Sequence, residues 1–148
     1  MIRMMLIVTI DGARVALPAD RIDCVIELGA LTPVPKSSPA IAGLSTLRSR
    51  VLTVIDTPVA IGLHDGRSEE VGSHGRAVVV RHDGHDYALS IDAAQDVRQA
   101  RAELDPLSLD VGKGWSRVAL GVATIDDEAV LAVDIDRIIK HSEIMPAA

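Results

Sequence analysis

The segment HDGHD, residues 82–86, combines two histidines with two aspartates that could act as metal ligands or as acids and bases. His82 and His85 are three residues apart, a spacing that could hold a metal ion on a helix. The Asp83-Gly84 pair between them is instead typical of a β-hairpin, because glycine accepts the positive φ angle that the turn requires. The two imidazoles would then flank a solvated turn without converging. A small β-barrel enzyme or ligand binder that uses His82 and His85 remains a minor alternative.

Cys24 is the only cysteine, so an intrachain disulfide and a CxxC metal site are both excluded. A reactive thiolate needs a cationic, partly exposed setting, whereas Cys24 begins the apolar run CVIEL and is predicted to be a buried small hydrophobe. No GxSxG, P-loop or GxGxxG motif is present. The sequence therefore predicts no catalytic site and no cofactor, and favours a protein that works by contact with other proteins.

The segment IAGLSTLRSRVLTVID, residues 41–56, places Arg48 and Arg50 at the tip of an otherwise apolar hairpin. A plain surface turn is the simplest interpretation. A similar pattern returns in ALGVATIDDEAVLAVD, residues 119–134, where the tip is acidic instead. The two tips would therefore present opposite charges to partners.

Composition excludes several other classes of function. The chain has 148 residues, of which 48% are hydrophobic and 24% charged, and this indicates one globular domain. Phe is absent and Trp115 and Tyr87 are the only aromatic residues, so the core must be aliphatic. The net charge of −6 and the absence of a basic run argue against nucleic-acid binding. No apolar run is long enough for direct membrane insertion or for a signal peptide, so a cytoplasmic location is expected.

Short β-branched runs separated by turn pairs such as Asp11-Gly12 predict an antiparallel sandwich or barrel. The predicted strands cover residues 6–10, 14–18, 24–28, 51–56, 77–82, 87–91, 118–125 and 129–135. The predicted helical segments are a single turn at 18–22, a short helix at 57–63 and a closing helix at 134–144, whereas 64–75 reads as a linker and 109–115 as a loop. Asp56 and Asp134 would lie at helix starts, where a carboxylate accepts backbone N–H bonds.

The two halves of the chain resemble each other. Residues 11–25 align with residues 83–97, and they share Asp-Gly, Ala-Leu and a final Val. Gly43 stands thirteen residues before Asp56, and Gly121 stands thirteen before Asp134. This echo predicts two similar β lobes, each a hairpin, a bend and a second hairpin.

The arginine-tipped hairpin also resembles the signature of the CheW-like family, in which Gly-Val-Ile-Asn-Leu-Arg-Gly precedes an apolar strand that ends in Asp. The matching positions are Gly43, Leu47, Arg48, Val51, Val54, Ile55 and Asp56. Residues 21–43 and 87–97, and VLAVDIDRII at 130–139, are similar to further family segments. The resemblance runs from about Leu6 to Ile139.

This resemblance implies an all-β fold of two small five-stranded β-barrel subdomains around a shared aliphatic core, with short helices that include one at the C-terminus. The chain would form one domain over residues 1–148. Subdomain 1 would cover roughly 14–75 and subdomain 2 roughly 76–134, with strands and helices exchanged at the ends.

The function implied by the resemblance is that of a non-catalytic adaptor between chemoreceptors and a CheA-type histidine kinase. The partners would be the kinase's regulatory domain and the chemoreceptor's cytoplasmic hairpin tip, which would recruit the protein to receptor arrays. The implied partner-binding residues are Ile22, Val25, Gly43, Leu47, Arg48 and Val51.

Arg48 would either order its lobe through an internal ion pair or contact the receptor tip, because arginine is prominent among residues that dominate interface energies. Arg50 is expected to be solvated. Several positions depart from the family pattern: Ser49 replaces a glycine at the turn, and Cys24 replaces a glutamate that can pair with the arginine, a role that Glu27 could fill. These departures keep open an alternative, in which the module binds a kinase or another regulator in a non-chemotaxis pathway without receptor contact.

Overall fold

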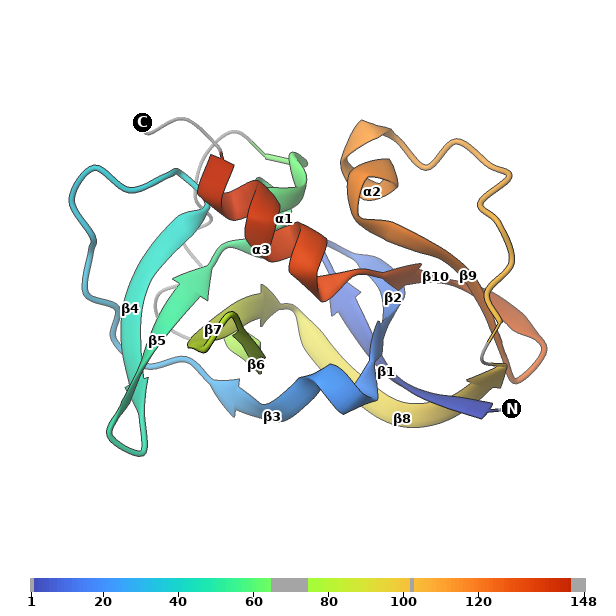
Figure 1. Ribbon diagram of the computed structural model, residues 1–148, viewed down its shortest axis with the longest axis horizontal. Helices are drawn as coiled ribbons and strands as arrows, with labels where there is room; N and C mark the ends of the chain where they lie inside the picture. The colour runs from blue at the N-terminus through green and yellow to red at the C-terminus, as the bar shows by residue number, and fades with distance from the viewer. Residues whose placement is uncertain (1, 65–74, 102, 145–148) are drawn as a thin grey trace.

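The computed structural model describes residues 2–64, 75–101 and 103–144, and it is mainly β, as predicted (Figure 1). The strands within the described residues are β1 (Ile2–Ile10), β2 (Ala13–Pro18), β3 (Ile22–Glu27), β4 (Ile41–Leu47), β5 (Arg50–Ile55), β6 (Arg76–His82), β7 (His85–Ile91), β8 (Ala93–Arg101), β9 (Ala119–Ile125) and β10 (Glu128–Val133). The helical elements are η1 (Ala19–Arg21), α1 (Thr57–Ile61), α2 (Lys113–Val118) and α3 (Ile135–Ile144).

The strands form two five-stranded sheets with the same internal plan. Sheet I has the strand order β8-β1-β2-β10-β9, and sheet II has the order β3-β6-β7-β5-β4. Neighbouring strands are antiparallel except for one parallel pair in each sheet, β2 with β10 and β5 with β7. The two halves of the chain correspond strand by strand, so that β1 to β5 of the first half match β6 to β10 of the second half in order. Each half supplies its first hairpin to one sheet and its last three strands to the other, so the duplicated halves exchange strands.

The sheets are curled, but closed barrels are not confirmed. The edge strands β3 and β4 do not pair with each other, and neither do β8 and β9. One isolated bridge closes part of each gap: Thr32 pairs with Leu44 beside sheet II, and Asp105 pairs with Val122 beside sheet I. Each sheet is thus a strongly bent layer, closed on one side by a connecting segment instead of a continuous ladder.

Two glycines allow these closing segments to approach. Gly43 and Gly121 have φ angles of 151° and 149°, in the range that favours glycine. A Cβ atom at Gly43 would lie 2.8 Å from the carbonyl oxygen of Thr32, and one at Gly121 would lie 2.7 Å from that of Asp105. Both distances are shorter than a side chain tolerates, so the backbone contact requires glycine at both positions.

Four hairpins turn through two residues, each with positive φ at both central positions, as in type I′ turns. The central pairs are Asp11-Gly12, Arg48-Ser49, Asp83-Gly84 and Asp126-Asp127. Ser49 adopts a φ of 68° although it lacks the freedom of glycine. The turn shape is therefore kept at the Arg48-Ser49 tip, and the backbone carries the strain.

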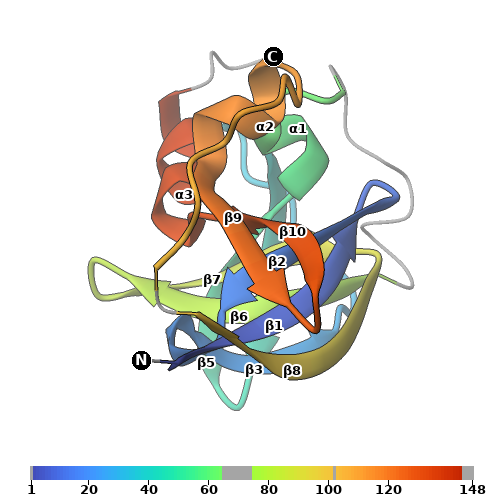
Figure 2. The ribbon, with the colours of Figure 1, turned by 90° about the vertical axis from the view of Figure 1, so that its right-hand side faces the viewer.

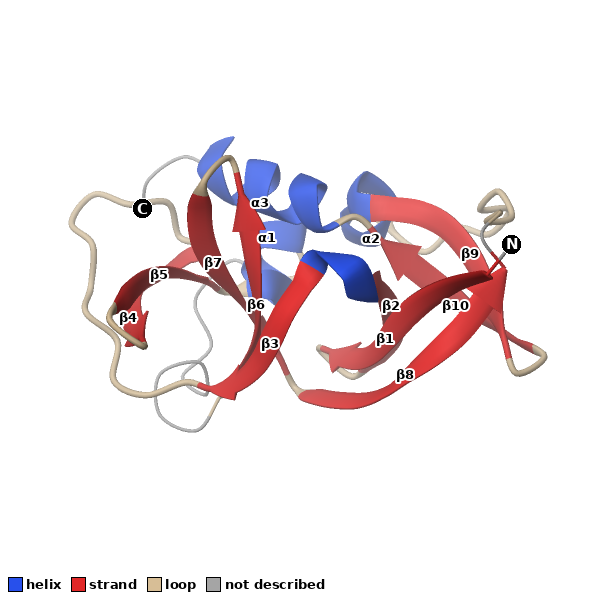
Figure 3. Ribbon diagram, turned by 60° about the horizontal axis from the view of Figure 1, so that its bottom comes forward, coloured by secondary structure: helices blue, strands red, loops and turns tan. Residues whose placement is uncertain are grey.

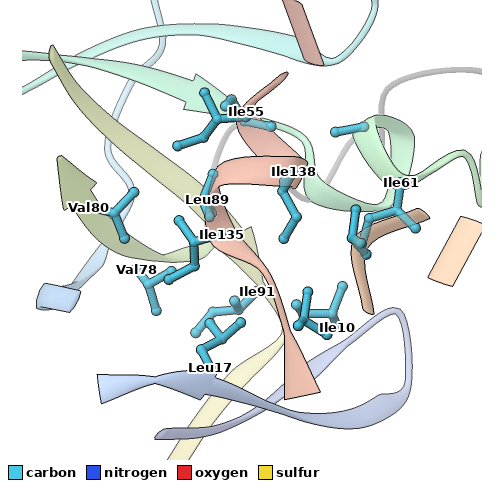
Figure 4. Packing of buried hydrophobic residues seen from close by; sticks show 14 of the residues in the cluster. Ile10, Leu17, Ile55, Ile61, Val78, Val80, Leu89, Ile91, Ile135 and Ile138 are labelled. Atoms are coloured by element: carbon cyan, nitrogen blue, oxygen red, sulfur yellow. The ribbon is translucent and has the colours of Figure 1, made fainter. Parts of the chain in front are cut away.

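Three aliphatic clusters fill the molecule. One lines the interior of each curled sheet, and the largest lies between the two sheets and the helices (Figure 4). Ile10 and Leu17 enter this shared core from sheet I, Val78 and Leu89 enter from sheet II, and Ile138 enters from α3. Trp115 only packs against its border, so the predicted aliphatic core is confirmed.

The predicted helices at 18–22, 57–63 and 134–144 correspond to η1, α1 and α3. The helices α1, α2 and α3 lie together along one side of the sheets (Figure 1). Asp56 caps α1 by accepting the N–H of Val59 at 3.4 Å, and Asp134 accepts the N–H of Asp136 at 2.9 Å, as predicted.

The sequence misassigned two elements. The loop predicted at 109–115 ends in α2, which forms where Gly114 packs against the carbonyl oxygen of Ile61. The strand β8 was not predicted because AAQDVRQAR has no β-branched run; it forms by pairing with β1. The linker predicted at 64–75 lies almost wholly outside the described residues.

Candidate partner-binding site

The six predicted partner-binding residues all lie on or beside sheet II, but only three are well exposed. Val25 on β3 and Val51 on β5 are 42% and 59% exposed, and Arg48 is exposed at the tip between β4 and β5. The other three are less accessible: Leu47 is partly buried against the interior of sheet II, Ile22 is partly buried against the shared core, and Gly43 is buried. The accessible part of the predicted site is therefore Val25, Arg48 and Val51.

Arg50, not Arg48, is the ion-paired arginine of this hairpin. Its guanidinium lies 3.2 Å from Asp23 on β3 and 3.5 Å from Asp86 on β7. The hydrogen bond to Asp23, followed by the charge of Asp86, raises the pKa of Arg50. The Arg50 side chain is nevertheless 41% exposed, so it is solvated, as expected, and ion-paired as well, which was not expected. Its position as the first residue of β5 directs it across the curled sheet to the edge strand.

Arg48 forms no ion pair with any described residue, so the structure does not support the internal ion pair considered for it. Glu27, considered as its partner, is exposed at the far end of β3. Asp23, one position before Cys24, supplies the carboxylate instead, and it pairs with Arg50. Asp23 therefore pairs with Arg50 and not with Arg48. The Arg48 guanidinium lies exposed at the tip, where its N–H donors are available to a partner.

The HDGHD turn is not wholly solvated, and this prediction is wrong for His82. The His82 side chain is only 12% exposed; its Nδ1 lies 2.7 Å from Asp136 and its Nε2 lies 3.3 Å from Asp83. His85, which pairs with His82 across the hairpin, is exposed. Within the described part of the chain, no three His, Cys, Asp or Glu side chains could together hold a metal ion.

Asp136 is the centre of this group. Arg21 donates two hydrogen bonds of 2.8 Å to the two oxygens of its carboxylate, and the imidazole of His82 contacts one of them. The hydrogen bonds from Arg21 lower the pKa of Asp136 to about 2; the bond to His82 acts in the same direction, and partial burial opposes both.

Cys24 is partly buried against the interior of sheet II, and so is less enclosed than predicted. Its place in the alternating pattern of β3 accounts for its burial: its neighbours Asp23 and Val25 are exposed, whereas Cys24 faces inward.

The sequence reasoning missed a second exposed apolar surface, on sheet I. Ile2 and Met4 on β1 and Val97 on β8 are all exposed. Leu6 pairs with Val97, so alternation along β1 places Met4 and Ile2 on the same face as Val97. Figure 3 shows β1 and β8 beside β3, the strand that carries Val25. The predicted strand began only at residue 6, so it left out Ile2 and Met4.

Membrane crossing by a helix finds no support in the described residues, because none of their helices combines the length and apolarity that a span requires.

Comparisons with known proteins agree with this fold. The family model described as CheW-like domain matches residues 4–143. The chain is 27% identical over 133 residues to chemotaxis protein CheW of Thermotoga maritima, an alignment that covers 89% of this chain and 84% of that protein. The crystal structure of scaffolding protein TtCheW from Thermoanaerobacter tengcongensis superimposes with a TM-score of 0.73 at 20% identity, covering 91% of this chain and 86% of that one. This last likeness concerns the fold alone.

Proposed function

The chain belongs to the CheW-like domain family of non-catalytic scaffolding proteins, and we propose that it is an adaptor that couples chemoreceptors to a CheA-type histidine kinase. The observation that carries this proposal is the accessible surface of Val25, Arg48 and Val51 on sheet II, of which Arg48 and Val51 lie in the segment that bears the family's motif. The protein would work in the cytoplasm, where its partners would recruit it to membrane receptor arrays.

The chemistry of this surface suits the hairpin tip of a receptor. Two exposed valines offer apolar area to the side of a helix, and Arg48 offers several N–H donors and a flat face to polar groups at the tip. Arginine is among the residue types that dominate binding when they are desolvated at the centre of an interface. Arg48 has no competing ion pair with the described residues, so a partner would not first have to break one.

The experiment is a binding assay of Arg48→Glu with two separate ligands, a receptor tip fragment and a kinase regulatory domain. We expect the substitution to weaken receptor binding about tenfold or more, because reversing a charge at a binding hot spot removes more than about 1.4 kcal/mol. Kinase binding should change little. Arg76→Glu is the matched control, because Arg76 is also exposed on sheet II and has no ion pair with the described residues.

Each outcome is informative. Unchanged receptor binding by Arg48→Glu would remove Arg48 from the interface. An unsubstituted protein that binds the kinase domain but not receptor tips would favour the alternative module, which serves another pathway without receptor contact. The replacement of the family's glutamate by Cys24, with Asp23 and Arg50 forming the pair instead, is the observation that keeps this alternative in view.

A further inference from the structure

A polar network joins three parts of the chain where the two sheets meet. Arg21 belongs to η1, which carries the chain from β2 of sheet I to β3 of sheet II. Its guanidinium donates to both oxygens of Asp136 on α3 and, at 3.1 Å, to the carbonyl oxygen of Arg81 on β6. His82 contacts the same carboxylate. One arginine thus connects the crossing segment, sheet II and the closing helix.

The other crossing between the sheets is built differently. The chain passes from β7 to β8 through Asp92 alone, whose N–H donates to Thr9 at 2.7 Å and whose carboxylate accepts the N–H of Gly12 at 2.8 Å. These short contacts involve the backbone of the β1–β2 hairpin, so they anchor this crossing firmly to sheet I. The η1 crossing is anchored mainly through the side chain of Arg21.

The shared core stabilises the contact between the two sheets but does little to fix their relative orientation. Its buried residues are Val, Ile, Leu and Ala, with Tyr87 as the one aromatic member. Hydrophobic burial is non-directional, and aliphatic side chains of similar size can repack with small losses of stability. Hydrogen bonds to charged groups require defined distances and angles, so a network such as that of Arg21 can select one arrangement.

Packing beside the network leaves room for another arrangement. A pocket of about 280 Å³ opens next to Arg21 and Asp136. Its lining comes from sheet I, from η1 and from the start of α3, and includes Arg3, Leu120, Arg21 and Asp136. A movement of η1 and α3 relative to sheet I would therefore meet open space here, not close-packed side chains.

We propose that the Arg21–Asp136–His82 network sets the angle between sheet I and sheet II. The exposed apolar residues of the two sheets, Val97 on one and Val25 on the other, are then held in one relative placement. The consequence for binding rests on the proposed function, because a partner that contacts both sheets would meet a preformed surface. The angle itself does not depend on any partner.

The test measures the angle without a partner, as a distance distribution between two spin labels by pulsed electron paramagnetic resonance. Thr46 on β4 and Thr124 on β9 are exposed and occupy equivalent places in the two sheets. Both are changed to cysteine in a Cys24→Ala background and labelled. We expect one narrow distance population in this protein, and a broader distribution or a second population after Arg21→Gln.

Two controls separate the network from general destabilisation. Arg14→Gln removes an exposed ion pair with Glu128 inside sheet I, and Ile138→Val loosens the shared core without touching the network. Both should keep the narrow population. His82→Gln removes one contact of the network and should broaden the distribution less than Arg21→Gln, and it serves as the deciding variant if Arg21→Gln does not fold.

An unchanged narrow distribution in the folded Arg21 or His82 variant would overturn the proposal. Equal broadening in Ile138→Val would overturn it too, because loss of core packing would then be sufficient. Since no receptor or kinase enters the measurement, its outcome is independent of whether the protein is a chemoreceptor adaptor.

Discussion

Sheet I and sheet II share a strand order, a pair of two-residue hairpins and a closing glycine. They differ in that the tip of the β4–β5 hairpin is basic, whereas the tip of the β9–β10 hairpin is acidic. In sheet II, Arg50 at the start of β5 reaches Asp23 on the edge strand β3. In sheet I, Asp126 on the β9–β10 hairpin reaches Arg98 on the edge strand β8 at 3.0 Å. Each sheet thus has an ion pair between this hairpin and an edge strand, with the charges exchanged and with the paired residues at different positions.

This difference separates what shapes the sheets from what their surfaces offer. The hairpin tips can differ in charge because the curl depends on backbone contacts at Gly43 and Gly121, not on the sign of an ion pair. Figure 2 shows the β9–β10 hairpin of sheet I in front of β1 and β2. One tip leaves Arg48 exposed and the other leaves Asp127 exposed, so the duplicated fold presents two distinct surfaces for partners.

The largest loss of stability is expected from substitution of the closing glycine, a feature that the two sheets share. Gly43→Ala and Gly121→Ala should each lower the free energy of unfolding by about 2–4 kcal/mol, because the added Cβ would strain a positive-φ backbone and collide with a carbonyl oxygen. Chemical denaturation measures the loss. Gly29→Ala is the control, since a Cβ there meets open space. A tolerated change at only one position would show that the two closures are not equivalent.

The chain crosses between the sheets at η1 and at Asp92, and the η1 crossing is held mainly by the side chain of Arg21. Asp136→Asn tests the contribution of that side-chain contact to stability. The pKa of Asp136 is lowered to about 2, below its value of roughly 3.9 in an unfolded chain. The stabilisation is therefore fully present above about pH 4 and is lost as the pH falls through about 2. At pH 7 we expect Asp136→Asn to lose about 1 kcal/mol, an amount reduced by solvent screening of this partly exposed pair.

Denaturation curves at pH 7 and at successively lower pH provide the measurement. The difference between Asp136→Asn and the unsubstituted protein should shrink toward zero near pH 2. Asp96→Asn, in an exposed pair with Arg98, should show little difference at either pH. A constant difference across the range would contradict the assigned role of the ionised carboxylate.

A glycine substitution should stabilise the Arg48-Ser49 turn more than the Asp126-Asp127 turn, the two hairpin turns that lack glycine. Ser49→Gly should raise the free energy of unfolding by about 1 kcal/mol, because a positive φ strains serine but not glycine. Asp127→Gly should gain less, since aspartate tolerates the left-handed region better. Thermal unfolding of the two variants in parallel gives the comparison, and equal gains would show that the turns are strained alike.

The smallest effects concern the exchanged ion pairs. Double-mutant cycles on Asp23 with Arg50 and on Arg98 with Asp126 should give weak couplings of the same sign, because all four side chains are substantially exposed. Both couplings should fade at high salt. A coupling that resists salt in one sheet alone would mean that its closure depends on charge.

Much of the fold could be read from local patterns. Asp-Gly turns between β-branched runs located the first hairpin of each half, and the spacing from Gly43 to Asp56 and from Gly121 to Asp134 revealed the duplication. The helix caps at Asp56 and Asp134 followed from residue type and position. These features depend on neighbours close in sequence, where φ preferences and side-chain periodicity act directly.

Other features depended on the tertiary structure. Strand β8 pairs with β1, almost a hundred residues away, so its polar sequence carried no strand signal. The ion-pair partner of the arginine hairpin was misjudged because Asp23 and Arg50 meet only when sheet II curls. His82 was placed in solvent because its partner Asp136 lies on a distant helix. Local sequence determines turns, caps and strand-forming runs, whereas ion pairs and edge strands depend on which distant segments the fold brings within a few ångströms of each other.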